Sequence, residues 1–394
     1  MAEATDSGAA GTDSASPGGA PSGTGTTAAG VAADGTTADG TAADGAAADG
    51  AAGKARSRPR RSTLRDVAAR AQVDPSIVSR VLGGEDWRVS APTRERIDRA
   101  VKALNYVPHR MARGLRTGET LTLAMLLPHI GDPAYFNMMT GAIAAAAESN
   151  YVALFADTND DPALELQEID RLTGRVDGVV SLTARPGSPG IARIGASGTP
   201  VVLLNRHGDS GLPSVIGPDR AGAVLAVTHL TGLGHRRIAH LSGPLDLDPS
   251  RRRRDGYLAV MADAGLPVDP GWLAESELAE DPAAEQARTL LRLPARRRPT
   301  ALFASTLPSA LGALREFRAQ GVDVPGDISV VGFDDHPLAD HLWAPLTTVR
   351  MPHVVMGQLA VRLLIQLIRQ EPVPAQTVVE DPPVLVVRGS TGPV

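Results

Sequence analysis

The chain has 394 residues, no cysteine and a formal net charge of −5. This length exceeds what one compact core holds, so two or three domains are expected. The absence of cysteine excludes disulfides and thiolate metal sites. The sequence has no apolar run long enough to span a membrane and no export signal at its start, so a cytoplasmic protein is expected.

The net charge conceals an uneven distribution along the chain. Residues 1–53 hold seven acidic and no basic residues, whereas residues 54–118 hold sixteen Lys and Arg against six Asp and Glu. The remainder of the chain is acidic. A strongly basic segment beside an acidic body indicates a polyanion partner that binds at one place.

The first segment, residues 1–53, consists almost entirely of Ala, Gly, Thr, Ser and Asp, with a five-residue echo such as TAADG and AAADG. Large apolar side chains are nearly absent, so nothing offsets the entropy of ordering and a disordered tail is predicted. The basic run KARSRPRR follows at 54–61. It is either a solvated linker or a source of additional phosphate contacts.

Two short helices are predicted next. Thr63 is placed to cap LRDVAAR, and Asp74 is placed to cap PSIVSRVL, which has Pro75 at its first position. Apolar residues recur at helical spacing in both segments, and a third helix is predicted to start after Ser90. Two short helices joined by a tight turn form a helix-turn-helix, the unit that places its second helix in the major groove of DNA.

The polar face of the second helix carries the candidate base contacts. Arg80 has a donor fork that fits O6 and N7 of guanine, although a surface arginine that touches phosphate is the alternative. Ser76 and Ser79 lie on the same side of the helix. Ser76 is the less specific candidate, because a short hydroxyl meets several bases or a phosphate.

From about residue 121 the pattern changes. Apolar runs such as LTLAMLLP, VDGVVSL, PVVLLN and ISVVGF alternate with helical stretches such as ALELQEIDRLT and GQLAVRLLIQLIRQ. Short buried strands that alternate with helices are typical of parallel sheets in an α/β architecture. The expected fold is therefore an all-α helix-turn-helix domain followed by an α/β body of two doubly wound parallel-sheet lobes.

The residues of both parts carry a family resemblance. TLRDVAARAQVDPSIVSRVL, followed by RVSAPTRERIDRAVKALNYVPHRMARGLRTG, closely resembles the DNA-binding domain of LacI/GalR-family repressors. HLTGLGHRRIAHLSGP, RRDGY, ISVVGFDD, APLTTVRMP and VVRGST resemble signature stretches of that family's effector domain. The resemblance implies a body similar to periplasmic sugar-binding proteins, in which two lobes close on a ligand.

The resemblance also implies domain limits. They are a tail at 1–53, a DNA-binding domain at 54–108, a hinge helix at 109–118 and a two-lobed effector-binding and dimerisation domain at 119–394. In this family the hinge helix folds on operator DNA, and a leucine from each subunit enters the minor groove. The matching residue is Leu115, which would otherwise be interpreted as a linker core residue. A leucine wedge unstacks one base step and brings neighbouring arginines to the minor groove.

The sequence departs from the family pattern at several positions. Gln72 replaces the usual turn glycine, Gly83 replaces an asparagine, and His109 replaces the asparagine that starts the hinge helix. The GGEDW loop is one residue longer than usual. None of these changes abolishes the motif. The predicted DNA-binding residues are Thr63, Pro75, Ser76, Ser79, Arg80, Arg88, His109, Arg113, Leu115 and Arg116.

Two positions match the family's effector cleft. Arg253 corresponds to the cleft arginine, and Asp334 corresponds to the cleft aspartate after the VVGF strand. A guanidinium and a carboxylate that face one cleft bind hydroxyl groups from both sides, as a sugar or nucleoside requires. The alternatives are a solvated charge run for RRRR at 251–254 and a strand-end cap for Asp334.

Other cleft positions differ from the family. Thr306 and Leu307 stand where Asn-Asp is usual, and HIGDPAYF lacks both the aspartate and the first aromatic of the corresponding family loop. Tyr135 and Phe136 remain candidates for the ligand wall, with ordinary packing as the alternative. The predicted effector-binding residues are Tyr135, Phe136, Arg253, Thr306 and Asp334.

The sequence does not fit two other classes of protein, an enzyme and a solute-binding protein. The sequence has no nucleophile elbow, Walker A loop, dinucleotide fingerprint or metal-binding histidine cluster, so no catalytic residue, metal or cofactor is predicted. Asp334 and Asp335 resemble a catalytic pair, but adjacent strand-end residues point in different directions. A solute-binding protein would need an export signal and no helix-turn-helix. The histidines expected to lie mostly on the surface are His235, His240, His336, His341 and His353.

The sequence therefore predicts a sequence-specific transcriptional regulator, a repressor whose operator affinity a small molecule controls. An activator or a ligand-unresponsive regulator of the same family is the alternative. The predicted partners are palindromic double-stranded operator DNA, a small-molecule effector for which a sugar is one candidate, and a second copy of the chain. A homodimer is expected, with a tetramer as the alternative, at the nucleoid in the cytoplasm and away from any membrane.

Overall fold

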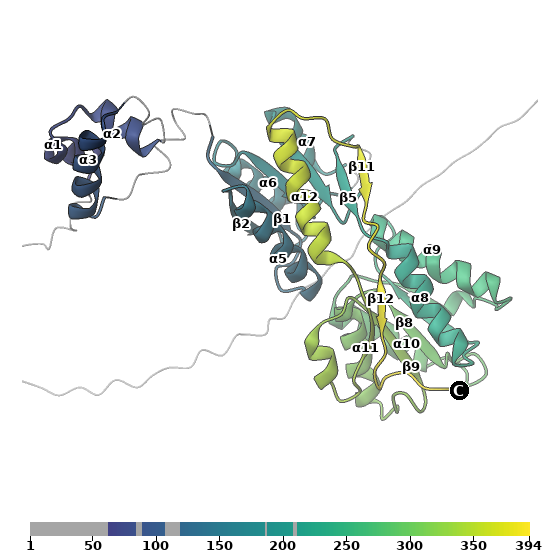
Figure 1. The fold of residues 1–394 in the computed structure, drawn as a ribbon. Helices are drawn as coiled ribbons and strands as arrows, with labels where there is room; N and C mark the ends of the chain where they lie inside the picture. Colours follow the sequence, from purple (N-terminus) through teal and green to yellow (C-terminus); the bar gives the residue numbers. More distant parts are fainter. Residues whose placement is uncertain (1–61, 84–88, 107–118, 186, 208–210) are drawn as a thin grey trace, which may run out of the picture. The chain divides into compact units, whose positions relative to one another are not determined.

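The computed structural model describes residues 62–83, 89–106, 119–185, 187–207 and 211–394. The chain divides after Arg61, and the described residues all belong to the second unit. Figure 1 shows a helical part, within residues 62–106, and an α/β body, within residues 119–394.

The helical part has three helices, as the sequence predicted. Thr63 and Asp66 form a capping box, in which the Thr63 hydroxyl accepts from the Asp66 N–H at 3.3 Å and the Asp66 carboxylate accepts from the Thr63 N–H at 2.8 Å. Asp74 caps the second helix by accepting from the Ser76 N–H at 2.8 Å. The helices are α1 (Leu64–Ala71), α2 (Pro75–Leu82) and α3 (Ala91–Ala103).

The three helices share one small core. The turn between α1 and α2 passes through Gln72, which has the left-handed conformation with φ 54° and ψ 50°. Glycine adopts this region without steric cost, whereas other residues lose roughly 1–2 kcal/mol there. The buried core residues are Val67, Ala68, Ala71, Val78, Ile97, Ala100 and Tyr106.

The body contains two six-stranded sheets, one in each lobe. Their strand orders are β11-β5-β4-β3-β1-β2 and β12-β10-β9-β8-β6-β7. The described strand pairs are parallel except β10 with β12. In both sheets the chain winds first one way and then the other, so the switch points lie between β1 and β3 and between β6 and β8. The predicted doubly wound lobes are confirmed.

The first lobe combines the start of the body with two C-terminal elements. Its elements are β1 (Thr122–Leu127), α5 (Pro133–Glu148), β2 (Val152–Asp157), α6 (Pro162–Leu172), β3 (Gly178–Ser181), α7 (Pro189–Ser197), β4 (Val201–Leu204), β5 (Ser214–Ile216), α12 (His353–Ile368) and β11 (Gln376–Val378).

The second lobe holds the intervening segment and the last strand. Its elements are α8 (Asp219–Gly232), β6 (Ile238–Ser242), α9 (Asp248–Asp263), η2 (Pro270–Trp272), β7 (Leu273–Glu275), α10 (Glu280–Leu291), β8 (Ala301–Ala304), α11 (Leu307–Ala319), β9 (Ser329–Phe333), η3 (Pro337–His341), β10 (Thr347–Arg350) and β12 (Val384–Val386).

Three connections join the lobes. The chain crosses after β5, after β10 and between β11 and β12 (Figure 1). Helix α12 packs against α5 at a close approach, because a Cβ added to Gly141 would lie 2.0 Å from the carbonyl oxygen of Val354. A Cβ added to Gly357 would likewise lie 2.0 Å from the carbonyl oxygen of Met138. The segment after the second crossing is therefore an integral part of the first lobe.

Each central strand is buried on both faces of its sheet. Along β1, Leu123, Met125 and Leu127 join the core on the α5 and α12 side, and Ala124 and Leu126 join the core on the other side. This two-sided burial explains the nearly continuous apolar runs in the sequence. The carboxyl ends of the strands remain the places where polar residues gather, and in such folds ligands bind there.

Within the described ranges, no helix is long and apolar enough to cross a membrane.

Candidate DNA-binding surface and effector cleft

Helix α2 exposes the polar face that the sequence predicted. Pro75, Ser76 and Arg80 are exposed and Ser79 is half-buried, whereas Val78 on the opposite face is fully buried. Ser76 and Arg80 are four residues apart and so share one side of the helix. This side is available to the edges of bases in a major groove.

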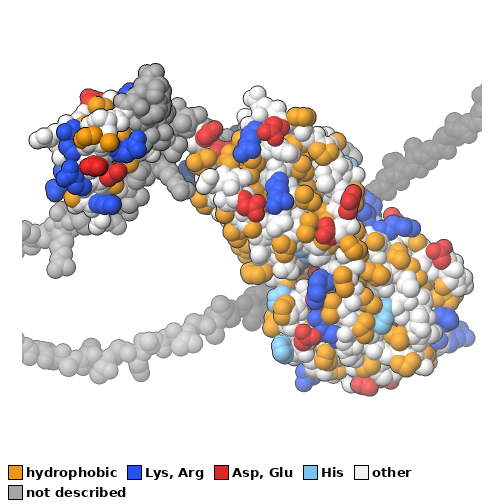
Figure 2. Space-filling model, in the orientation of Figure 1, with side chains coloured by type: hydrophobic (Ala, Val, Ile, Leu, Met, Phe, Trp, Pro, Cys, Tyr) orange, Lys and Arg blue, Asp and Glu red, His pale blue; other side chains and the backbone are white. Residues whose placement is uncertain are grey.

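Several basic side chains are exposed on the helical part. Figure 2 shows several of them on the visible side, beside a smaller number of acidic residues. The Thr63 hydroxyl is engaged in the cap of α1, so a contact between Thr63 and DNA stays a prediction. The exposed basic residues are Arg65, Arg70, Arg80, Arg94, Arg96, Arg99 and Lys102.

The other predicted DNA contacts cannot be placed. They lie outside the described residues and comprise the basic run at 54–61 together with Arg88, His109, Arg113, Leu115 and Arg116.

The body encloses a cleft between its two lobes, at the carboxyl ends of the strands. The larger cavity measures about 340 Å³ and a smaller one of about 30 Å³ adjoins it. Their walls come from loops that follow β1 to β4 in the first lobe and β6 to β9 in the second. The residues that line both cavities are Asp132, Tyr135, Arg206, Leu247 and Leu278.

Arg253 is fixed at the smaller cavity by its surroundings. The side chain lies on α9 and is 4% exposed. Its Nε donates to Asp219 Oδ1 at 2.8 Å, and its Nη1 donates to the carbonyl oxygen of Ser305 at 2.5 Å. The guanidinium also stacks 4.0 Å above the ring of Phe333. Arg253 therefore needs no ligand to hold its position.

Asp334 faces Arg253 with unused hydrogen-bonding capacity. Oδ2 of Asp334 lies 3.9 Å from Nη1 of Arg253, and Oδ1 lies 3.4 Å from Nε2 of His353. In the described part of the chain, Oδ1 accepts no hydrogen bond. Burial raises the pKa of Asp334 to about 6, against the opposing effect of Arg253. Burial and Arg253 lower the pKa of His353 to about 4, so this imidazole is neutral at neutral pH.

The first lobe contributes a second carboxylate that the sequence analysis missed. Asp132 caps α5 by accepting from the Ala134 N–H at 2.9 Å, and it lines both cavities. Burial and the negative charge of Asp334 raise the pKa of Asp132 to about 6. A signal was available, because the Asp-Pro pair at Asp132 repeats the helix start at Asp74. The carboxylates of Asp132 and Asp334 therefore line the same cavity from opposite lobes.

Two arginines of the first lobe were also missed. Arg206, 5% exposed, follows β4 and donates from Nη1 to the carbonyl oxygen of Thr183 at 2.9 Å. Arg185 follows β3, pairs with Asp160, and donates from Nη1 to Asp246 of the second lobe at 2.7 Å. Both arginines line the larger cavity. Their charge within a few residues after a buried strand was the available signal.

The predicted effector residues divide into two groups. Tyr135 lines both cavities, and Arg253, Thr306 and Asp334 line the smaller one. Phe136 is 62% exposed and lines neither cavity, because adjacent residues on a helix point about 100° apart. The structure therefore does not place Phe136 at a ligand wall. The burial of Arg253 also rules out a solvated charge run as its environment.

The prediction for the histidines was wrong at three of the five positions, since His235, His240 and His353 are 2%, 0% and 4% exposed. His240 lies on β6 and stacks between Tyr257 and Phe303, at centroid distances of 5.1 Å and 4.8 Å. Burial depends on such tertiary contacts, which local sequence does not reveal. Among the described residues, no group of three acidic or histidine side chains is arranged to hold a metal ion.

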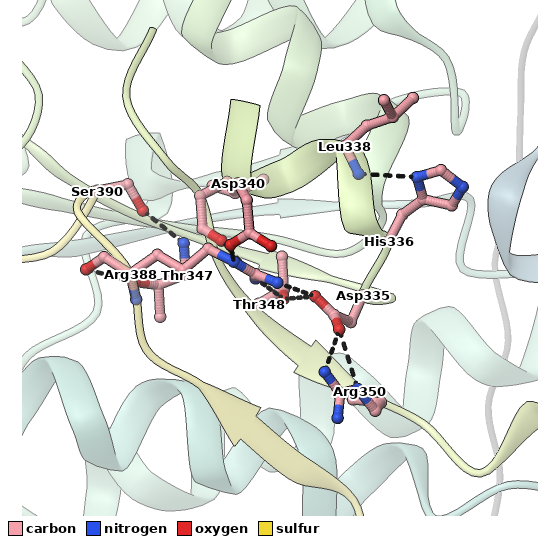
Figure 3. Close-up of polar contacts among 10 residues, drawn as sticks. Asp335, His336, Leu338, Asp340, Thr347, Thr348, Arg350, Arg388 and Ser390 are labelled. Atoms are coloured by element: carbon pink, nitrogen blue, oxygen red, sulfur yellow. Dashed lines mark hydrogen bonds and ion pairs between the residues drawn. The ribbon is translucent and has the colours of Figure 1, made fainter. Parts of the chain in front are cut away.

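Asp335 points away from the cleft, as the sequence predicted for adjacent strand-end residues. Figure 3 shows its carboxylate between Arg350 and Arg388. Asp334 therefore lines the cleft while Asp335 binds two arginines outside it, so the two carboxylates do not form a catalytic pair.

Comparisons with known proteins agree with this arrangement. The family model for bacterial regulatory proteins of the lacI family matches residues 63–109. The family model for the periplasmic binding protein-like domain matches residues 227–391. The transcriptional repressor CytR of Escherichia coli (strain K12) is 31% identical over 340 residues, covering 86% of this chain and 98% of the relative. The ribose operon repressor of the same organism is 33% identical over 337 residues, covering 84% of this chain and 99% of the relative.

Solved structures show the same similarity. The complex of the transcriptional regulator CelR with cellobiose has a TM-score of 0.63 at 32% identity and covers 84% of this chain and 100% of that chain. The lac repressor dimer bound to operator and the anti-inducer ONPF has a TM-score of 0.74 at 28% identity, with the same coverage.

A helix-turn-helix with an exposed polar face and a two-lobed body that encloses a charged cleft define a DNA-binding transcriptional regulator with an effector-binding domain. The chain belongs to the LacI family of bacterial regulatory proteins. It is a transcriptional repressor, and because members of this family regulate transcription, it is not an enzyme.

Proposed function

We propose that this repressor binds a palindromic operator as a homodimer in the cytoplasm, and that a polyhydroxylated small molecule bound between the lobes controls its operator affinity. One helix-turn-helix covers a half-site, so tight binding needs two domains related by a two-fold axis. The lac repressor structure, a dimer on its operator, supports this stoichiometry. The proposed domain limits are 54–108 for DNA binding, 109–118 for the hinge and 119–394 for the body.

The observation that carries the effector proposal is Oδ1 of Asp334, a buried atom that accepts no hydrogen bond from the described residues. A buried carboxylate oxygen without a donor is costly, and a ligand hydroxyl removes that cost. Arg206 and Asp132 face the same space from the other lobe. Donors and acceptors on both walls suit a molecule with several hydroxyl groups. The CelR complex with cellobiose and the name of the ribose operon repressor support a sugar.

The helix-turn-helix and the cleft are coupled through lobe closure in this proposal. A ligand that contacts both walls favours one relative position of the lobes, and release of DNA follows if the operator-bound dimer needs another. The coupling free energy is expected to be on the order of 1–3 kcal/mol, and it acts equally in both directions. Operator DNA should therefore weaken effector binding by the same factor.

The test begins with the selection of bound sites from a random DNA pool by the full chain. A panel of pentoses, hexoses, disaccharides and nucleosides is then screened for release of the selected operator. The expected result is a palindromic site and release by one class of polyhydroxylated ligand. Selection of a single half-site by a monomer would overturn the dimer. Release by apolar or purely anionic compounds instead of the panel would overturn the effector class.

A further inference from the structure

Two adjacent carboxylates at the end of β9 differ sharply in their bonding. Asp334 leaves Oδ1 without a hydrogen bond among the described residues, whereas both oxygens of Asp335 are engaged. Oδ1 of Asp335 accepts from Thr348 Oγ1 at 2.6 Å and lies 2.8 Å from Arg388 Nη2. Oδ2 accepts from Nε and Nη2 of Arg350 at 2.9 Å and 2.7 Å. Burial alone would raise the pKa of Asp335, but these hydrogen bonds outweigh it and lower the pKa.

Among the partners of Asp335, Arg388 makes contacts with several other groups as well. It follows β12 in the C-terminal segment, and its side chain is 8% exposed. Besides Asp335, its Nη1 donates to the carbonyl oxygen of Leu346 at 2.9 Å and to Thr348 Oγ1 at 2.8 Å, and its Nε donates to Asp340 (Figure 3). One guanidinium thus connects the end of β9, the η3 helix and the start of β10. The single ammonium of a lysine cannot reproduce this planar set of donors.

The backbone at Asp334 requires support of this kind. Its φ is 71°, in the left-handed region that costs a non-glycine residue roughly 1–2 kcal/mol. Its N–H donates to the carbonyl oxygen of Val349 at 3.0 Å, but within the described part of the chain Oδ1 of its carboxylate accepts no hydrogen bond. The anchored side chain of Asp335 fixes the next peptide, and therefore the direction in which Asp334 leaves the strand.

The C-terminal segment is fastened to the lobe by other contacts. The Ser390 hydroxyl accepts from the Thr347 N–H at 2.8 Å and donates to the carbonyl oxygen of Val330 at 2.6 Å. The Val330 N–H donates to the carbonyl oxygen of Ser390 at 2.8 Å, and the backbone N–H of Arg388 donates to Thr347 Oγ1 at 2.9 Å. These bonds do not use the guanidinium of Arg388. Its buried donors are therefore available for a different task.

We propose that Arg388 is a positioning residue for the effector cleft, which holds Asp334 in place by fixing Asp335. This inference rests on the proposed function of the cleft. Asp334 then meets a ligand already directed toward Arg253, so binding does not spend free energy on ordering it. Without the guanidinium, the left-handed strand end relaxes and the Asp334 carboxylate turns toward water.

The experiment follows the Asp334 carboxyl group directly, without an effector. The full chain is labelled with [¹³Cγ]aspartate, and the Asp334 resonance is identified as the one lost in Asp334→Asn. Its titration is measured between about pH 4 and pH 8 in the wild type, Arg388→Lys and the control Arg362→Lys. Arg362 is 54% exposed and pairs with Glu148 on the first lobe. The groups that face Asp334 — Arg253, His353, Asp219 and Asp132 — are unchanged in all three proteins.

The wild type and Arg362→Lys are expected to titrate near 6. Arg388→Lys should titrate about one unit or more lower, because a carboxylate that reaches water regains its ordinary pKa. A folded Arg388→Lys with the wild-type titration would overturn the proposal. So would a change confined to faster amide exchange in residues 384–394, which a fastening role alone would produce.

A second pair of variants covers the case in which Arg388→Lys does not fold. Thr348→Val removes one donor to Asp335, whereas Thr348→Ser keeps the hydroxyl. In Thr348→Val the pKa of Asp334 should be lower than in the wild type, and in Thr348→Ser it should return to the wild-type value. Equal titrations in both would contradict the proposal. Since the titration needs no effector, its outcome is independent of whether a sugar releases the operator.

Discussion

The two functional regions use arginine in opposite ways. Arg80 on α2 is exposed, so its guanidinium is hydrated in the free protein. Arg253 in the cleft is 4% exposed and is held by Asp219, Ser305 and Phe333. An exposed arginine can change with little effect on folding, whereas a buried one is part of the fold and of the site at once. Binding and stability should therefore separate in the DNA-binding domain and remain linked in the cleft.

The largest effect on stability is expected for Arg253→Met. The change leaves Asp219 buried with Arg252 as its remaining partner, so the free energy of unfolding should fall by about 3 kcal/mol. Urea denaturation monitored by circular dichroism measures this loss. Arg251→Met, at a neighbouring position that is 47% exposed, is the control and should change stability by less than about 0.5 kcal/mol. Equal effects at the two positions would remove the contrast between buried and exposed arginines.

The second expected effect depends on pH. The folded pKa of Asp334, about 6, lies above the usual aspartate value of 3.8, so its protonated form is favoured in the folded state. Its contribution to stability is therefore full below pH 3.8 and is lost as the pH rises through 6. Asp334→Asn does not titrate, so its stability relative to the wild type should rise by about 2–3 kcal/mol across this window. A difference that is independent of pH would show that Asp334 is not buried as described.

The third effect belongs to binding and not to folding. Arg80→Ala should reduce discrimination between operator and random DNA by about 1–3 kcal/mol per half-site, because the bidentate contact with guanine is lost. Competition binding at fixed salt measures this ratio. Its free energy of unfolding should stay within about 0.5 kcal/mol of the wild type, as expected for an exposed position. An unchanged affinity ratio would show that Arg80 contacts only phosphate.

The smallest effect concerns the turn of the helix-turn-helix. Gln72→Gly should stabilise the DNA-binding domain by roughly 0.5–1 kcal/mol, since glycine tolerates the left-handed φ of 54°. The measurement is the Tm of the unfolding transition that operator DNA shifts upward. Asn150→Gly, at another left-handed position in the body, should leave that transition unchanged and serves as the control. Destabilisation by Gln72→Gly would mean that the glutamine side chain supports the turn.

Sequence predicted the local features of the DNA-binding domain well because their causes are local. The caps at Thr63 and Asp74 involve residues two or three positions away, and their hydrogen bonds are present as expected. The alternation of strands and helices likewise predicted both lobes. The outcome differed at His240, because its burial depends on Tyr257 and Phe303, which lie elsewhere in the chain.

The cleft could be predicted only in part. Arg253 and Asp334 were found because the family resemblance marks them, and both line the smaller cavity. Asp132 and Arg206 were missed because they follow different strands and meet only when the sheet forms. The switch points of a doubly wound sheet bring such strand ends together, so polar residues directly after each apolar run were the signal to use.

The most direct test of the coupling between cleft and operator is effector titration of the operator complex of Asp334→Asn. The measurement is operator release by the ligand that releases the wild type, followed by fluorescence anisotropy. Operator affinity without effector should match the wild type, and the effector concentration for half-release should rise by at least about tenfold, which corresponds to 1.4 kcal/mol. Normal release from Asp334→Asn would contradict the assignment of the effector site to this cleft.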